Sequence, residues 1–338
     1  MKIAVRKIGP MGTTYGDQFN QDFFNNLWNE ELISKLDSND EVIWFEHMPV
    51  TGEAFDELLS DFDAVIGAWI KPGMITEGIL SKHPKIKYIG TISHGYSSFD
   101  KDACKKYGIT VTNAIFNDDA VSQHVFALLL EICNNVGINN SFYKKEKWQS
   151  EQPDWNKLYT RQISLSGKIF GIIGLGNIGT KTAQIARGFG MQVLANSRSI
   201  KNGEQYQKIT QTSFEEVIMK SDVISIHCPL TESTLNLIDK SAIEKMKQGV
   251  ILINTSRGEI IDEEALNEAL MQRKVYAAGL DVLANEPLKH PNCLINNPYT
   301  VTTEHIAWAS IESRIKSIKV GCENFFNWKN GTPTSVIS

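Results

Sequence analysis

The sequence has no long hydrophobic run, no closely spaced cysteines and no excess of basic residues. No apolar segment approaches the roughly 20 residues of a membrane helix, and the start MKIAVRKIGPMG lacks the apolar core of a signal peptide. The five cysteines are scattered and never stand in C-x-x-C spacing, so we expect reduced thiols in the cytoplasm. The net charge of −5 argues against nucleic acid or an anionic membrane as a partner. No histidine pair with an acid has metal-ligand spacing, so no metal is expected.

What the chain does contain is a regular alternation of strand-like and helix-like segments over 338 residues, a length suited to about two domains. This alternation predicts an α/β fold with parallel sheets and right-handed crossovers. The predicted strands are 3–8, 42–45, 64–67, 88–92, 109–112, 168–173, 192–195, 223–227, 250–254, 275–280 and 300–302. The predicted helices include 19–36, 54–59, 78–81, 101–107, one long helix over 120–145, 178–189 and 311–328.

The most informative segment is KIFGIIGLGNIG, in which a buried strand opens into Gly174-x-Gly176-x-x-Gly179 before a helix. In that context the first glycine permits a tight turn, the second lets the backbone approach a pyrophosphate, and the third lets helix and strand pack closely. The diphosphate is expected on the N–H groups at the helix N-terminus. We therefore predict a Rossmann-like dinucleotide-binding domain.

Because this fingerprint begins in mid-chain, something of domain size precedes it. We predict a cofactor domain over 113–302, inserted into a discontinuous substrate domain made of 1–112 and 303–338. The last helix is too small to fold alone and is expected to return to one of the two sheets. An active site is expected in the cleft between the domains, where strand carboxyl ends gather ligands.

The residue after the second strand of such a domain normally discriminates between NAD and NADP. Here the chain reads Asn196, Ser197, Arg198, Ser199, with no acid to accept a bond from a ribose hydroxyl. The two serines can donate to a 2′-phosphate and Arg198 can pair with it, which favours NADP(H) over NAD(H). The alternative is a solvated loop arginine.

Three polar groups follow predicted strands of the cofactor domain: Arg257, Glu286 and His305. Hydride exchange at a carbon next to a carboxylate needs a cation to bind the acid, an imidazole to exchange a proton and a carboxylate to orient that imidazole. Asp281 is expected to accept a bond from the nicotinamide carboxamide. Taken singly, the three residues are equally well explained as a surface ion pair, a solvated acid and a helix cap.

Together these motifs resemble the D-2-hydroxyacid dehydrogenase family over nearly the whole chain. The segments that carry the resemblance are GIIGLGNIG, HCPLTESTLNLI (227–238), NTSRGEIIDEEAL (254–266), GLDVLANEPL (279–288) and TEHIAWAS (303–310). The resemblance implies two flavodoxin-like domains, a homodimer, and a catalytic set of Arg257, Glu286 and His305. It also implies a substrate carboxylate held at His94 and Gly95. The cofactor-binding residues assigned with it, besides the glycines and 196–199, are Asn177, Ile178, His227, Cys228, Pro229, Thr234, Thr255, Ser256, Asp281 and Ala307.

Within the family, segments 119–137 and 153–159, with Gln123–His124, are similar to the glycerate dehydrogenase (hydroxypyruvate reductase) branch. The expected substrates are small 2-keto acids such as hydroxypyruvate or glyoxylate. Trp69 departs from that branch and is either a lid over a bulkier or aromatic keto acid or a buried core residue. His124, in an apolar helix, is interpreted as a hydrogen-bonded core residue. An alternative from another class is a non-catalytic NAD(P)H-sensing protein.

Overall fold

The computed structural model describes residues 1–9, 19–96, 99–116, 118–146, 160–288 and 290–338. The chain forms two compact units, one made of Met1–Asn117 with Ala309–Ser338 and the other of Asp118–Trp308. Each unit contains one parallel sheet with helices on both faces, so the predicted α/β fold is confirmed.

The first unit is built on a five-stranded sheet in the order β2-β1-β3-β4-β5. Its strands are β1 (Lys2–Arg6), β2 (Glu41–Phe45), β3 (Ala64–Ile66), β4 (Tyr88–Gly90) and β5 (Thr110–Thr112). All neighbouring strands pair in parallel. This is the flavodoxin order, in which ligands bind outside the carboxyl ends of the strands.

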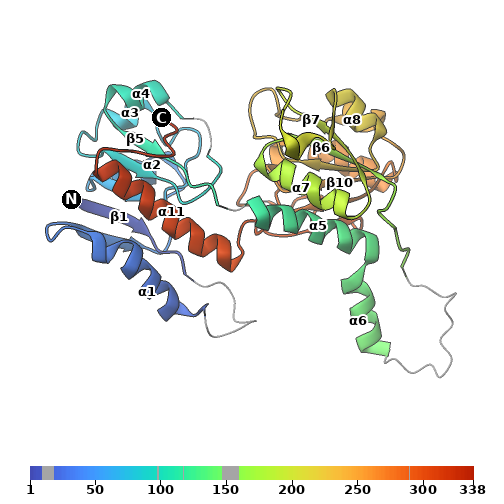
Figure 1. Ribbon diagram of the computed structural model, residues 1–338, viewed down its shortest axis with the longest axis horizontal. Coiled ribbons are helices and arrows are strands. Elements are labelled where there is room, and N and C mark those ends of the chain that lie inside the picture. The colour runs from blue at the N-terminus through green and yellow to red at the C-terminus, as the bar shows by residue number, and fades with distance from the viewer. Residues whose placement is uncertain (10–18, 97–98, 117, 147–159, 289) are drawn as a thin grey trace. The chain divides into compact units, whose positions relative to one another are not determined.

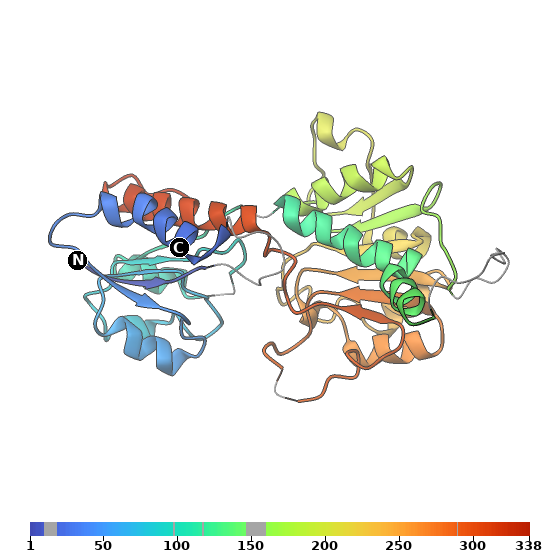
Figure 2. The same ribbon diagram turned by 90° about the horizontal axis from the view of Figure 1, so that it is seen from below.

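Both faces of the first sheet are covered, which explains why the central residues of its short strands are apolar. One face packs against α1 (Gln21–Glu31) and α11 (Ile311–Lys329), which lie side by side (Figure 1). The opposite face is covered by α2 (Gly52–Leu59), α3 (Glu77–Leu80) and α4 (Lys101–Lys106), as Figure 2 shows. The last helix of the chain thus completes the core of the first unit.

The second unit is built on a seven-stranded sheet in the order β12-β11-β10-β9-β6-β7-β8. Its strands are β6 (Ile169–Ile173), β7 (Gln192–Asn196), β8 (Thr210–Gln211), β9 (Val223–Ile226), β10 (Val250–Asn254), β11 (Val275–Leu280) and β12 (Thr300–Thr302). The first six follow the Rossmann order 3-2-1-4-5-6, and β12 adds a seventh strand beside β11. The sequence analysis did not predict the two-residue strand β8.

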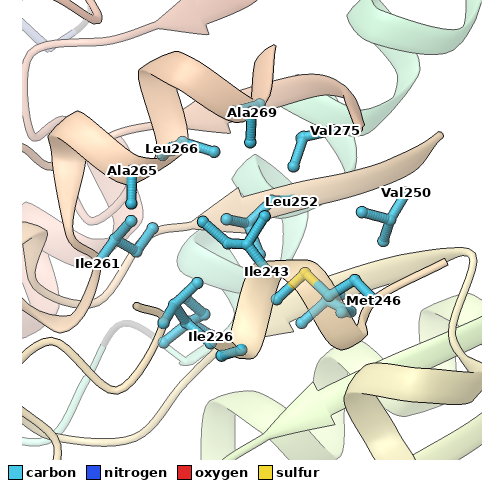
Figure 3. Packing of buried hydrophobic residues seen from close by; sticks show 14 of the residues in the cluster. Ile226, Ile243, Met246, Val250, Leu252, Ile261, Ala265, Leu266, Ala269 and Val275 are labelled. Carbon is cyan, nitrogen blue, oxygen red and sulfur yellow. The ribbon is translucent and has the colours of Figure 1, made fainter. Parts of the chain in front are cut away.

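Two apolar layers hold this sheet between helices. On one face α5 (Asp118–Asn134) and α7 (Asn177–Gly188) pack next to each other. On the other face α8 (Phe214–Lys220), α9 (Lys240–Lys245) and α10 (Glu263–Met271) cover the strands. Figure 3 shows this second layer, in which Ile226, Leu252 and Leu266 are fully buried. Each such side chain contributes about 2 kcal/mol through the apolar surface it removes from water.

The single helix predicted over 120–145 is wrong. The structure has two helices, α5 and α6 (Val136–Glu146), separated by Asn135 with φ = 51°. This left-handed conformation ends a helix, and asparagine adopts it more readily than most residues. In the described part of the chain, no single helix is long and apolar enough to span a membrane. Helix α5 and residues 136–142 pass the same test of length and composition only when taken together, and they are bent by 51° where they join.

The boundaries between the two compact units fall after residues 117 and 308, a few residues later in the chain than the predicted boundaries at 113 and 302. Residues after 112 stay with the first unit because Asn113 accepts a bond from Asn324 and the amide of Ala114 donates to Ser93. Residues after 302 stay with the second unit because Thr303 and Ala307 donate to Asp281.

Candidate active site

The glycine fingerprint forms the turn between β6 and α7. Gly174 has φ = +103°, and a Cβ atom there would lie 2.4 Å from the amide nitrogen of Cys228. A Cβ on Gly179 would lie 2.2 Å from the carbonyl oxygen of Gly174. Both positions therefore require glycine, one for backbone conformation and both for close backbone approach. Asn177 and Ile178 form the first turn of α7.

Gly176 has a different role, because nothing lies within 4 Å of the Cβ it lacks. It is the N-cap of α7 and offers no side-chain cap to the helix amides. By contrast α1, α8, α9, α10 and α11 all have an Asn, Ser or Asp side chain that accepts from the first turn. The amides in the first turn of α7 therefore lack a side-chain cap, and there is open space beside Gly176. This arrangement suits binding of the diphosphate of a dinucleotide.

A second observation in the same unit also fits a bound cofactor. The hydroxyl oxygen of Thr255, in the loop after β10, is buried and has no hydrogen-bond partner among the described residues. Buried polar atoms are nearly always paired in folded proteins, so an unpaired one on a binding loop is consistent with a ligand partner. Thr255 was among the residues that the sequence assigned to the cofactor.

The loop after β7 contains the four residues expected near the ribose. Asn196 ends the strand and donates its side-chain amide to the carbonyl of Thr212. The hydroxyl of Ser197 donates to the carbonyl of Ser199, 2.7 Å away, instead of pointing outward. Arg198 is exposed. Of the expected phosphate donors, Arg198 and Ser199 are thus exposed, whereas Ser197 is partly buried.

The loop after β9 contacts the glycine turn directly. The amide of His227 donates to the carbonyl of Ile173, and its Nε2 lies 2.9 Å from Oγ of Ser225. Burial lowers the pKa of His227 to about 3, so the imidazole is neutral at physiological pH. Burial raises the pKa of the Cys228 thiol to about 11, which keeps the sulfur protonated and unsuited to nucleophilic attack.

The remaining residues assigned to the cofactor lie on the same loops. Thr234 is partly buried and donates its hydroxyl to the carbonyl of Pro229. Ser256 donates its hydroxyl to the carbonyl of Cys228, 2.6 Å away. This bond joins the loops after β9 and β10, so the structure brings these predicted residues together at one edge of the sheet.

Arg257 lies one residue further along the loop after β10. Its side chain is partly buried and donates through Nη1 to the carbonyl of Ser256. Burial lowers the pKa of this guanidinium, while the negative charges of Glu286 and Glu259 act in the opposite direction. The next residue, Gly258, packs so closely on the following loop that a Cβ would lie 2.0 Å from the carbonyl carbon of Leu283. This contact brings the loops of Arg257 and Glu286 together.

Glu286 and His305 form a direct pair. Oε2 of Glu286 lies 2.6 Å from Nδ1 of His305, and Oε1 accepts from the amide of Leu283. Burial acts to raise the pKa of Glu286, but the bonds from His305 and Leu283 and the charges of His305 and Arg257 outweigh it, so the pKa lies below its usual range. An ionised Glu286 makes Nδ1 the protonated nitrogen and leaves Nε2 to exchange a proton with a substrate.

Asp281 is bound by the loop that follows β12. Its side chain has no exposed surface, and its carboxylate is held by the amides of Ile306 and Ala307 and by the hydroxyl of Thr303. The amide of His305 also donates to its backbone carbonyl. Ala307 is likewise buried and bound to Asp281 through its amide.

The predicted substrate residues lie in the first unit. His94 and Gly95 follow β4, where the carbonyl of His94 accepts from Asn113 and that of Gly95 accepts from Ser93. Trp69 follows β3 and is 40% exposed, which excludes the buried-core alternative. The ammonium of Lys71 lies 5.6 Å from its ring centroid.

The sequence analysis missed three residues that organise the site. The amide of Leu283 holds Glu286, and Thr303 and His124 connect to Asp281. A histidine in an otherwise apolar helix was the one available signal for His124. No local pattern links it to Thr303, which lies 179 positions away.

Comparison with known proteins identifies the family of the chain. The profile described as "D-isomer specific 2-hydroxyacid dehydrogenase, NAD binding domain" matches residues 126–307. The chain is 39% identical over 261 residues to a hydroxypyruvate reductase of Blautia hydrogenotrophica, covering 77% of this chain and 81% of that protein. It is 30% identical over 307 residues to a glyoxylate reductase of Korarchaeum cryptofilum, covering 89% and 90%.

Among solved structures, one similar fold is an acyclic imino acid reductase in complex with NADPH and D-Arg. The TM-score is 0.82 at 29% identity, and all of both chains is covered. The family is established by the profile match, which covers more than half of the chain, and by relatives at least 30% identical over most of their length. The chain belongs to the D-isomer specific 2-hydroxyacid dehydrogenase family and is an oxidoreductase with a nicotinamide dinucleotide cofactor.

Proposed function

We propose that this enzyme reduces small 2-keto acids, hydroxypyruvate or glyoxylate, to D-2-hydroxy acids with NADPH. The observation that carries the proposal is the Glu286–His305 pair beside the Arg257 loop, at the carboxyl edge of a sheet with Rossmann order. The substrate choice is supported by relatives named hydroxypyruvate reductase and glyoxylate reductase.

In the proposed reaction each of the three residues acts at a stated atom. Arg257 binds the substrate carboxylate through its planar fork of donors and polarises the neighbouring carbonyl. His305 gives its Nε2 proton to the carbonyl oxygen on reduction and takes it back on oxidation. Glu286 holds Nδ1 and stabilises the imidazolium form. The cofactor supplies or accepts the hydride at the same carbon.

The preference for NADPH rests on the loop after β7. Its four residues contain no carboxylate, and Arg198 is exposed where a 2′-phosphate needs a cation. The imino acid reductase of similar fold was solved with NADPH. A preference for NADH would instead make Arg198 a solvated loop residue.

A bulkier 2-keto acid is the second candidate substrate. Trp69 is 40% exposed on a loop at the carboxyl edge of the first sheet, as a residue that contacts a larger or aromatic side chain would be. The backbone amides around His94 and Gly95 remain the proposed holders of the substrate carboxylate in that unit. The family resemblance further supports a homodimer, and the five unbridged thiols suit the cytoplasm.

The decisive experiment is steady-state oxidation of NADPH and of NADH with glyoxylate, hydroxypyruvate, pyruvate and phenylpyruvate. We expect the highest kcat/KM with hydroxypyruvate or glyoxylate and NADPH. A higher value with phenylpyruvate would transfer the proposal to bulky substrates. Cofactor binding without turnover of any acid would contradict both and support an NAD(P)H-sensing protein. Sedimentation equilibrium on the same sample tests the dimer.

A further inference from the structure

His124 connects helix α5 to the loop that carries His305. Its Nε2 lies 2.9 Å from Oγ1 of Thr303 and 3.5 Å from Oδ1 of Asp281. Its side chain is 19% exposed, on a helix whose other buried residues are apolar apart from Ser122. A polar ring at such a position needs partners, and both of its partners belong to the segment that organises the catalytic histidine.

The direction of the protons in this chain of bonds follows from the groups themselves. An ionised carboxylate only accepts, so the hydroxyl of Thr303, 2.6 Å from Oδ1 of Asp281, donates to it. That hydroxyl has a single proton, so toward His124 it can only accept. The proton of His124 is therefore on Nε2, and the bonds run from His124 to Thr303 to Asp281.

Asp281 is the point at which these bonds affect His305. Its carbonyl accepts from the amide of His305, and its two carboxylate oxygens accept from Ile306 and Ala307, all within 2.8–2.9 Å. His305 itself has φ = 50°, a left-handed conformation that a residue with a side chain keeps only when its surroundings enforce it. The backbone on both sides of His305 is held by the hydrogen bonds that Thr303 and residues 305–307 donate to Asp281.

We propose that His124 is a positioning residue, which acts through Thr303 and Asp281 to keep the His305 ring aligned for proton transfer. This inference rests on the proposed role of His305 as acid and base. It predicts a loss in kcat when the bonds are removed, because a misplaced imidazole reacts slowly without weakening the binding of substrate by Arg257.

The test uses two pairs of variants in the full-length enzyme. His124→Leu and Thr303→Val remove the hydrogen-bonding groups with little change in bulk. His124→Gln and Thr303→Ser retain a donor and a hydroxyl, respectively. We expect kcat to fall about tenfold in the first pair, with the KM for the keto acid and the Kd for NADPH within about twofold of wild type. The second pair should recover most of the loss.

The double variant His124→Leu/Thr303→Val distinguishes one connected chain of bonds from two separate effects. We expect its kcat to match that of the worse single variant, because residues that act through the same partner are not additive. Any of three results would overturn the inference. The kcat losses of the single variants could multiply in the double variant, kcat could be unchanged in both single variants, or the loss could appear only in KM or in the Kd for the cofactor.

Two further variants serve as controls. His83→Leu removes a similarly buried histidine that pairs with Asp56 in the first unit, and it should leave kcat unchanged. His305→Ala tests the underlying function: if it retains full turnover, the proposed role of His305 fails. If it loses turnover while His124→Leu does not, His305 keeps its role and the inference about His124 is wrong.

Discussion

Oε2 of Glu286 lies 2.6 Å from Nδ1 of His305, and the two residues come from different loops at the carboxyl edge of the second sheet. The pair explains how one imidazole is given a single tautomer and a single direction. The amide of Leu283 fixes the other oxygen of the same carboxylate, so the orientation of the ring follows from the backbone of its neighbouring loop.

Replacing Glu286 by glutamine removes the negative charge while keeping the shape of the side chain. The imidazolium formed during oxidation then lacks its counter-charge, so kcat should fall about 100-fold, within the range of general acid–base effects. Steady-state kinetics in both directions measures this. Glu264→Gln, at an exposed position of α10, is the matched control and should behave as wild type. Equal activity of the two variants would contradict the role of Glu286.

Arg257→Ala should change KM and kcat together. The guanidinium is expected to bind the substrate carboxylate in the ground state and to polarise the carbonyl in the transition state, so we expect a KM increase of at least tenfold and a lower kcat. Arg257→Lys tests the geometry, because lysine keeps the charge but not the planar fork. If Arg257→Lys equals wild type, charge alone is sufficient and the bidentate interpretation is wrong.

The glycines of the fingerprint should separate stability from cofactor binding. Gly179→Ala places a methyl group 2.2 Å from a backbone oxygen and should cost on the order of 3 kcal/mol. Gly176→Ala meets nothing within 4 Å, so its cost should stay below about 1 kcal/mol. Its methyl group should nonetheless weaken NADPH binding at least tenfold, as titration of cofactor fluorescence would show. Wild-type affinity in this variant would argue against a diphosphate at the start of α7.

Arg198→Gln tests the choice of cofactor. Because the proposed partner of Arg198 is the 2′-phosphate, kcat/KM for NADPH should fall about tenfold while that for NADH stays within twofold. Arg187→Gln, at the far end of α7, is the control for a lost surface cation. A parallel loss with both cofactors would show that Arg198 does not read the phosphate.

Much of the fold was predictable because its signals are local. Apolar segments of strand length, the turn from Gly174 to Gly179 and the helix at 311–328 each depend on neighbouring residues. The break at Asn135 was missed because neither a proline nor a glycine stands at the break itself, and Gly137 lies two residues beyond it. Its cause is one backbone angle.

The candidate site was predictable as a set of residues but not as a set of contacts. Arg257, Glu286 and His305 were identified from motifs that the family carries. The contacts of Asp281 were not predicted because its partners are backbone amides and a hydroxyl, groups that every loop contains. His124 was missed as a site residue because its partner Thr303 lies on another element far along the chain. Such contacts depend on how helices pack on the sheet, which local patterns do not specify.

His227 should make the stability of the second unit depend on pH. Its pKa is about 3 in the folded protein because burial disfavours the charged ring, whereas an unfolded chain has a histidine pKa near 6.5. Below pH 6.5 the unfolded state binds a proton that the folded state does not, so stability is present above that pH and is lost progressively as the pH falls toward 3. Between pH 7 and 5 this one group should remove about 2 kcal/mol from the free energy of unfolding.

His227→Gln should lose less stability than wild type over that interval in urea unfolding followed by circular dichroism, without cofactor. His47→Gln, at an exposed position, should follow the wild-type curve. Parallel curves for wild type and His227→Gln would show that His227 accepts a proton in the folded enzyme, and its neutral role beside the glycine turn would then be wrong.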